Sequence, residues 1–244
     1  MTSIFEQALG EDFARLQPML QKRFGVGLDA GYACIGRGVM TSVRRGPWWT
    51  VPFLQIGKIR NILIADVGAD VPFTIENYPY RDPFGRETVT FVREYRMREK
   101  PSRFDATMVL SNGEVLDYLG THQHLAVDLD LSVEADGSLH LRSGAQRFYE
   151  GRFVAFRFPM LFSGRADLRE SWDDSAQLYR VKLEVVNPVF GFLFGYEGEF
   201  RCEFPSASDA PARTRRGTGL SFWRTNRVTV SGSPRVRVPV RTGL

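Results

Sequence analysis

The chain has 244 residues, of which 43% are hydrophobic and 13% aromatic, including 19 phenylalanines. This much apolar side chain offsets the entropy of ordering a chain, so the composition excludes a protein that is disordered throughout. The net charge of +4 is unevenly placed, because no acidic residue follows Asp209 whereas eight arginines do, which leaves 24 basic residues against 28 acidic ones over residues 1–209. Nucleic-acid binding is therefore not expected, except through the basic tail.

The N-terminal region and the apolar runs predict a cytoplasmic protein without a transmembrane segment. The longest apolar stretches, near residues 189–196, are about eight residues, whereas a membrane-spanning helix needs roughly 20. The first nine residues carry Glu6 and no basic region, which is untypical of a secretory signal. Cys34 and Cys202 are too few and too distant in sequence for a disulfide scaffold or a zinc motif, and we interpret them as reduced, mostly buried thiols.

Residues 3–24 are expected to form short helices. Ser3 and Glu6 have the spacing of a capping box, in which each side chain satisfies a free amide at the helix start. Apolar residues then recur at helical spacing from residue 13 to residue 24. Pro18 either kinks one helix or opens a second helix at its first turn.

Residues 47–57 form a dense apolar patch that includes Trp48 and Trp49. The patch is compatible with a short helix despite Pro52. We favour a helix buried in the core, because apolar segments usually pack inside. The alternative is a lid or a surface-binding element.

From Val71 onward, apolar and polar residues alternate with the period of half-buried β-strands. Asn112-Gly113 and Asp136-Gly137 are typical of tight hairpin turns. The expected strands cover residues 88–98, 104–110, 116–118, 125–133, 139–141, 152–158, 165–170 and 179–186. A meander of this many strands has to curl or fold over to bury its inner face and protect its edges.

The last strand, residues 189–204, is predicted to present an aromatic wall. Glycines at the opposite parity, Gly191 and Gly195, indicate a bend or a close approach of another segment. The residues of one parity are Phe190, Phe192, Phe194, Tyr196, Phe200, Cys202 and Phe204.

Together these elements predict an α+β fold that is mainly antiparallel β, with N-terminal helices packed on a sheet curled into a barrel or half-barrel. The plan is calycin-like by analogy only. We expect one domain over residues 1–205. Residues 206–244 are rich in Ser, Pro, Arg, Thr and Gly, which predicts a basic, poorly ordered tail.

Five sequence phrases together resemble an uncharacterised bacterial family, domain of unknown function 4166. The resemblance covers about residues 3–204 and implies a stand-alone copy of a domain that is fused, in some relatives, to a dehydrogenase-like nucleotide-binding domain. No activity comes with the family, and the basic tail departs from its pattern. The phrases are Val71–Asn77, Gly85–Val89, Arg103–Met108, Asp117–His122 and Asn187–Tyr196.

Motifs for known cofactors are weak in this sequence. His122 and His124 share one face of a strand, and with Asp128 they faintly resemble a cupin metal strand, but two imidazoles alone do not fill a coordination sphere. Gly36-Arg37-Gly38 lacks the later glycine of a dinucleotide site. We therefore predict no cofactor and no metal.

The leading functional hypothesis is a module that binds a small apolar or amphipathic ligand in a barrel-like cavity. Arg93 lies on the apolar parity of its strand, where a charge must pair or face a polar cavity; Asp105 and Glu170 are the other polar groups expected to line the interior. The full set of predicted ligand-binding residues is Trp48, Trp49, Phe91, Arg93, Tyr95, Asp105, Glu170, Phe192, Phe194 and Tyr196.

Two further hypotheses remain open at this stage. The chain is an enzyme, or an accessory domain of a dehydrogenase-like redox partner, if at least two ionisable residues converge in a cavity. It is an interaction protein if the arginine-rich tail binds nucleic acid or anionic lipid in a salt-sensitive manner.

Overall fold

The computed structural model describes residues 2–51, 54, 55, 58, 61, 64–98, 100–120, 125–150, 154–157 and 164–207. The chain begins with helix α1 (Ile4–Leu9), the 3-10 helix η1 (Gly10–Arg15) and helix α2 (Pro18–Phe24). Ser3 caps α1 by accepting a hydrogen bond from the Glu6 amide at 3.1 Å. Pro18 opens α2 at its first turn, so the second of the two interpretations of Pro18 is confirmed.

Strands make up most of the remaining described chain. The 3-10 helix η2 (Trp48–Thr50) separates the first two of them. The strands are β1 (Cys34–Arg45), β2 (Gly68–Arg81), β3 (Glu87–Tyr95), β4 (Ser102–Ser111), β5 (Glu114–Leu119), β6 (Leu125–Val133), β7 (Leu139–Glu150), β8 (Val154–Arg157), β9 (Arg165–Asp173), β10 (Leu178–Asn187) and β11 (Gly191–Glu203).

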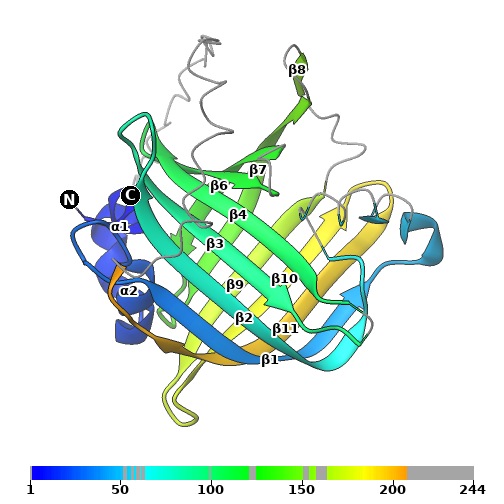
Figure 1. Ribbon diagram of the computed structural model, residues 1–244, viewed down its shortest axis with the longest axis horizontal. Coiled ribbons are helices and arrows are strands. Elements are labelled where there is room, and N and C mark those ends of the chain that lie inside the picture. Colours follow the sequence, from blue (N-terminus) through cyan, green and yellow to red (C-terminus); the bar gives the residue numbers. More distant parts are fainter. Residues whose placement is uncertain are drawn as a thin grey trace, which may run out of the picture.

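The strands form one antiparallel sheet that closes on itself (Figure 1). The order is β6-β5-β4-β3-β2-β1-β11-β10-β9-β7-β8, and an additional pairing of β6 with β7 closes the barrel. Closure removes the exposed edges that a flat meander would leave. The predicted mainly antiparallel β fold, a calycin-like barrel with N-terminal helices, is confirmed.

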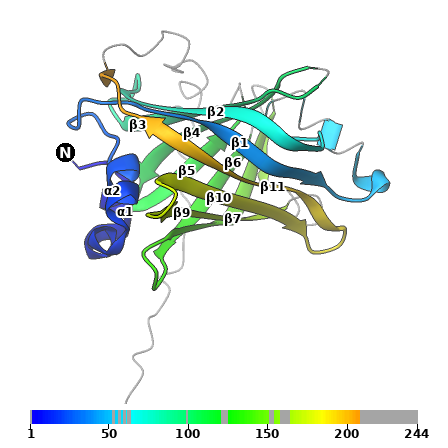
Figure 2. The same cartoon turned by 90° about the horizontal axis from the view of Figure 1, so that it is seen from below.

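The two ends of the barrel differ. The helices cover one end, which we call the helix end (Figure 2); there the Gln17 amide donates to the Gly137 carbonyl at 2.9 Å, and the Gln17 side chain bonds the backbone of Trp172. The opposite end, which we call the loop end, carries the β1–β2 connection (46–67), the β3–β4 turn (96–101) and the β10–β11 turn (188–190).

Aromatic rings fill much of the barrel interior. Phe200 contacts Phe73 edge-on at 5.6 Å and stacks on Tyr179 at 5.2 Å between ring centroids. A Cβ added at Gly36 would lie 2.8 Å from the Phe200 ring and 2.6 Å from Ile75. The ring of Phe200 therefore occupies the space that a side chain at position 36 would need.

Strand β1 was not among the predicted strands. Its register with β11 shifts between Val39 and Ser42, and glycines occupy two of its inward positions, Gly36 and Gly38. A bulge and missing side chains both interrupt the alternation on which strand prediction depends. The sequence pattern therefore hid a strand that lies at the centre of the sheet order.

The expectation of a buried core helix over residues 47–57 is wrong for the two tryptophans. Trp48 and Trp49 lie in η2 with 80% and 50% of their surface exposed, whereas Thr50 and Leu54 are buried. The described part of this segment therefore has apolar side chains both on the surface of the loop end and in the packed interior.

The two histidines, the basic tail and the domain boundary are expectations that the described residues do not test. His122 and His124 lie outside the described residues, as does nearly all of the tail, residues 208–244. The domain boundary at residue 205 remains a prediction. None of the described helices has both the length and the apolar character needed to cross a bilayer.

Candidate binding site in the barrel interior

Arg23 of α2 enters the barrel from the helix end and is fully surrounded by partners. Its Nε donates to Glu170 of β9, and its Nη1 donates to Asn77 Oδ1 at 3.0 Å and to Cys34 Sγ at 3.2 Å. The guanidinium also lies 4.8 Å from the centroid of the Phe200 ring. Each side of this buried cation therefore meets an acceptor or an aromatic face.

These contacts set the protonation of the helix-end cluster. Burial acts to lower the pKa of Arg23, but the Glu170 carboxylate and the two thiols outweigh it, so the pKa lies well above its ordinary value. The pKa of Cys34 is lowered, first by its hydrogen bond with Cys202 and then, against burial, by Arg23. Cys34 therefore gives up a proton more readily than an ordinary buried thiol.

Arg93 of β3 is the second buried arginine, and its surroundings are different. It shares the inner face of β3 with Phe91 and Tyr95, and it lies opposite Phe104 of β4. Its guanidinium is held over two rings, 4.7 Å from the Phe104 centroid and 5.3 Å from the Phe91 centroid. Only 7% of Arg93 is exposed, yet its buried Nη1 donates to no group in the described part of the chain.

Asp117 of β5 is an acidic group that interacts electrostatically with Arg93. It lies opposite Met108, an inward residue of β4, and it is buried. Burial raises the pKa of Asp117 to about 7, although Arg93 acts to lower it. Arg93 and Asp117 thus influence each other, but no ion pair joins them, and Asp117 Oδ1 accepts no hydrogen bond from any residue that the structure describes.

Two tyrosines lie on the same side of the interior as Arg93. The rings of Tyr95 and Tyr196 are 5.8 Å apart between centroids, and both residues are buried. Burial is the largest cause that raises the pKa of each phenol. Both therefore remain neutral hydroxyl groups that can donate or accept a hydrogen bond.

The structure brings together half of the predicted ligand-binding residues. Phe194 lies opposite Val185, an inward core residue of β10, so it joins the interior set. The predicted residues that share the interior around Arg93 are Phe91, Arg93, Tyr95, Phe194 and Tyr196, all of them buried.

The other predicted residues lie elsewhere. Asp105 pairs with Val92 in the sheet, so it is on the face opposite Arg93, where it binds Arg103 at 2.8 Å; the expectation that it lines the interior is wrong. Glu170 does lie inside but is bound to Arg23.

Phe192 leaves the expected aromatic wall because the register of β10 with β11 shifts between Val185 and Val186. Its ring lies under the Arg44 guanidinium at 5.4 Å, and Arg44 binds Glu184 on the exterior. Trp48 and Trp49 are on the surface of the loop end. None of these three side chains lines the interior with Arg93.

Asp117 and Phe104 are site residues that the sequence analysis missed. Asp117 shares the parity of Val115 and Leu119, but Leu116 and Tyr118 make the other parity of this strand apolar too. Only the parity of Val115 and Leu119 indicates an inward Asp117, a signal that the expected strand over residues 116–118 did not use. Phe104 had no such signal, because a phenylalanine at an inward position is ordinary core.

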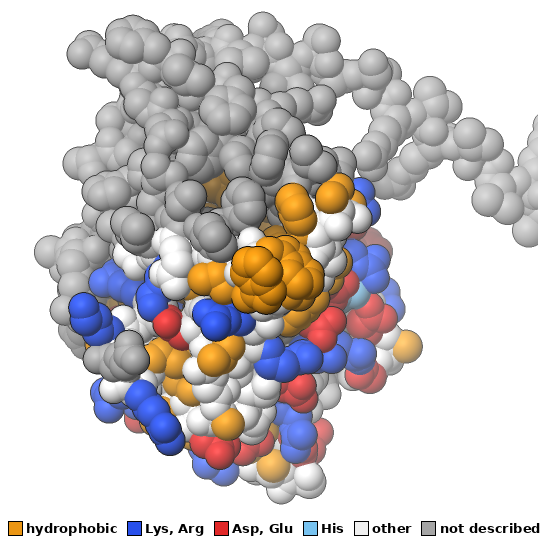
Figure 3. All heavy atoms as spheres, turned by 90° about the vertical axis from the view of Figure 1, so that its right-hand side faces the viewer, with side chains coloured by type: hydrophobic (Ala, Val, Ile, Leu, Met, Phe, Trp, Pro, Cys, Tyr) orange, Lys and Arg blue, Asp and Glu red, His pale blue; other side chains and the backbone are white. Residues whose placement is uncertain are grey.

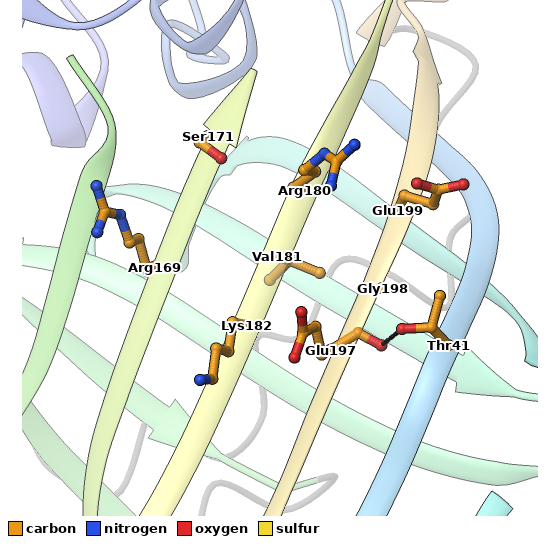
Figure 4. A pocket seen from close by; sticks show the side chains of 9 residues that line it. All are labelled: Thr41, Arg169, Ser171, Arg180, Val181, Lys182, Glu197, Gly198 and Glu199. Carbon is orange, nitrogen blue, oxygen red and sulfur yellow. Dashed lines mark hydrogen bonds between the residues drawn. The ribbon is translucent and has the colours of Figure 1, made fainter. Parts of the chain in front are cut away.

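A separate concavity of about 180 Å³ lies on the outer wall over β9, β10 and β11. Figure 4 shows its charged side chains on neighbouring strands. Arg180 binds Asp173 at 2.8 Å, and Arg169 binds Asp136 at 2.6 Å. Because its cations already have partners, this hollow offers a ligand less than the interior does. It is lined by Thr41, Arg169, Ser171, Arg180, Val181, Lys182, Glu197, Gly198 and Glu199.

The fold and the site define an antiparallel β-barrel protein with ionisable groups buried in an aromatic interior. The sequence profile of the family described as "Domain of unknown function (DUF4166)" matches residues 16–200, and the chain belongs to this family. The resemblance drawn from the five sequence phrases is thereby confirmed. The chain is also 28% identical over 206 residues to the uncharacterized protein YndH of Bacillus subtilis (strain 168), a similarity that covers 83% of this chain and 98% of that protein.

Proposed function

We propose that the barrel binds a small amphipathic molecule whose anionic head group is held by Arg93. The observation that carries the proposal is the buried Arg93 guanidinium, whose Nη1 has no acceptor among the described residues. A buried charge normally has both a counter-ion and hydrogen bonds, because desolvation without them is costly. A ligand that supplies both would complete this environment.

The geometry around Arg93 favours a planar or forked anion. Phe91 and Phe104 lie against the guanidinium, at 5.3 and 4.7 Å from their centroids. Cation–π contacts hold the group in place but leave its N–H donors free. A guanidinium presents those donors as a fork that matches a carboxylate or a phosphate.

The rest of the interior suits an apolar tail. The residues around Arg93 are mostly aromatic or aliphatic, and ligand pockets typically combine such a lining with a few polar anchors. Asp117 does not oppose an anion at slightly acidic pH, because its pKa of about 7 leaves it largely neutral there. The ligand class is therefore an anion with a hydrophobic body.

The test compares a dansyl-labelled fatty acid with its methyl ester, titrated into the purified full-length protein and followed by dansyl fluorescence. The wild type is expected to prefer the acid, and Arg93→Met to lose that preference, since a hydrogen bond to a charged group contributes about 1.5–3 kcal/mol. Arg37→Met is the matched control, because Arg37 is exposed on the outside and binds Glu203. A wild type that binds acid and ester equally would exclude the proposal.

The alternative, an enzyme or an accessory of a dehydrogenase-like partner, is favoured by one observation. A carboxyl group with a pKa of about 7 beside an arginine is suited to proton transfer. Mass spectrometry of the fatty-acid probe recovered after incubation with wild type and with Asp117→Asn distinguishes the two ideas. A probe altered only by the wild type favours catalysis, and a probe recovered intact from both favours binding.

A further inference from the structure

The loop end carries most of the exposed large hydrophobic side chains of the described chain. Trp48 and Trp49 are 80% and 50% exposed, and Val67 and Val189 are 56% and 60% exposed. Figure 3 views this end directly and shows a hydrophobic cluster with lysine and arginine side chains near it, among acidic ones. Apolar side chains gathered on one face in this way are typical of a surface that binds something.

The two tryptophans are held out by a structured segment. Their rings meet edge-on at 6.0 Å, and the Thr50 hydroxyl donates to the Pro47 carbonyl at 2.7 Å, which closes the turn of η2. The Gly46 amide donates to the Leu193 carbonyl of β11 at 2.6 Å. Both indoles are therefore presented to solvent by a fixed turn that is bonded to the barrel wall.

Exposed basic side chains from two elements lie at the same end of the barrel as this cluster. Arg45 ends β1, and Arg96, Arg98 and Lys100 lie in the β3–β4 turn; all four are exposed. None of the four forms an ion pair with a residue of the described chain, in contrast to Arg44, which binds Glu184 at 3.2 Å. Within the described chain, their charges are thus not neutralised by an acidic side chain.

We propose that the loop end docks on an anionic phospholipid bilayer, with Trp48 and Trp49 at the level of the head groups. Indole rings are favoured at membrane interfaces because they are apolar with one polar N–H. Basic side chains close to such a surface add attraction to anionic lipids. An apolar tip with exposed cations that form no ion pair within the described chain matches both layers of such a bilayer, the head groups and the acyl chains beneath them. The proposal does not depend on a ligand inside the barrel.

The test is co-flotation of the full-length protein with vesicles of phosphatidylcholine alone or mixed with phosphatidylglycerol. The wild type is expected to float with the mixed vesicles and to be released by salt, as electrostatic binding requires. Trp48→Ala/Trp49→Ala and, separately, Arg96→Gln/Arg98→Gln are each expected to bind roughly tenfold more weakly or worse. Because all four residues are exposed, these variants should fold, which circular dichroism checks.

Matched controls separate the loop end from the rest of the molecule. Arg37→Gln/Arg201→Gln removes two exposed cations near the helix end, and Val39→Ala removes an exposed apolar side chain from the barrel wall; both should bind vesicles like the wild type. Arg93→Met should also bind normally, which keeps this proposal distinct from the ligand site.

A second readout reports on the tryptophans themselves. Vesicles that contain brominated phosphatidylglycerol should quench tryptophan emission in the wild type, and that quenching should be lost in Trp48→Phe/Trp49→Phe. If both loop-end double variants bind mixed vesicles as tightly as the wild type, another part of the chain makes the contact, the basic tail included, and the proposal is wrong.

Discussion

Two arginines enter the same barrel and meet opposite conditions. Arg23, at the helix end, is bound by Glu170, Asn77 and Cys34. Arg93, farther along the interior, lies between two aromatic rings, and its Nη1 has no acceptor in the described chain. Arg23 therefore has hydrogen-bond acceptors around its guanidinium. Arg93 is held by aromatic contacts but keeps a donor that is unused within the described chain.

The difference shows that burial alone does not distinguish a charge with a full set of partners from one with an unused donor. Both arginines are buried, at 3% and 7% exposure, and both contact aromatic rings. What separates them is the set of acceptors, since partners compensate the desolvation of a buried cation, whereas a donor without an acceptor leaves part of that cost uncompensated.

The largest expected effect follows from removing Arg23. Arg23→Met leaves the Glu170 carboxylate buried without its counter-ion, and breaking a buried pair in this way typically costs about 3–5 kcal/mol of the free energy of unfolding. Urea denaturation of wild type and variant measures it. The double variant Arg23→Met/Glu170→Met should recover most of the loss, and a single variant within about 1 kcal/mol of the wild type would contradict the structural role.

In contrast to Arg23→Met, Asp117→Asn is expected to raise the free energy of unfolding, and to do so only at higher pH. The folded-state pKa of about 7 exceeds the ordinary value of 3.8, so the folded protein holds this proton more tightly than the unfolded chain does. Stability from this group is therefore complete below pH 3.8 and is lost as pH rises to about 7, by an upper limit of about 4 kcal/mol.

The asparagine variant avoids this loss because it carries no ionisable group. At pH 8 it should be more stable than the wild type, whereas at pH 4 the two should unfold at nearly the same urea concentration. Asp105→Asn is the control, since Asp105 is also buried but lies on the other face of the sheet and binds Arg103. Equal urea midpoints for wild type and Asp117→Asn at pH 8 would argue against a buried, ionisable Asp117.

Much of the barrel was predictable because alternation and turn residues are local signals. The Asn112-Gly113 turn joins β4 to β5, and the Asp136-Gly137 turn joins β6 to β7, as expected. Arg93 was identified by the same local logic, as a charge at an apolar position of its strand. Each of these features depends on a few neighbouring residues, which the sequence displays directly.

The parts that failed depend on register and on distant partners. Phe192 has the parity of Phe194, but a shift in the pairing of β10 with β11 places it outside; a one-residue slip reverses which face a side chain takes. Arg23 and Glu170 are 147 residues apart in sequence, so helical periodicity could not indicate that a helix residue completes a site in the barrel. The sequence therefore indicated Glu170 as an interior group but did not indicate Arg23, the partner that binds it.

Arg93→Met is expected to change stability much less than Arg23→Met does. The substitution removes a cation with an open donor and replaces it with a flexible apolar side chain that can pack against Phe91 and Phe104. The free energy of unfolding should stay within about 1 kcal/mol of the wild type or rise, as happens when buried charges are replaced by apolar groups. A loss as large as that of Arg23→Met in the same urea titration would mean that Arg93 is structural too.

The smallest expected effect is a pH dependence of ligand binding. As pH rises through about 7, Asp117 becomes a carboxylate, which attracts Arg93 and repels an anionic head group. The dissociation constant of the dansyl fatty acid should therefore increase a few-fold between pH 6 and pH 8, roughly the effect of one screened charge. Asp117→Asn should remove the increase while Asp105→Asn keeps it.

Tyr95 and Tyr196, the other titratable groups near Arg93, stay neutral over this range because burial raises the pKa of each. Binding that strengthens with pH would place the anion away from Asp117, and with it away from the open side of Arg93.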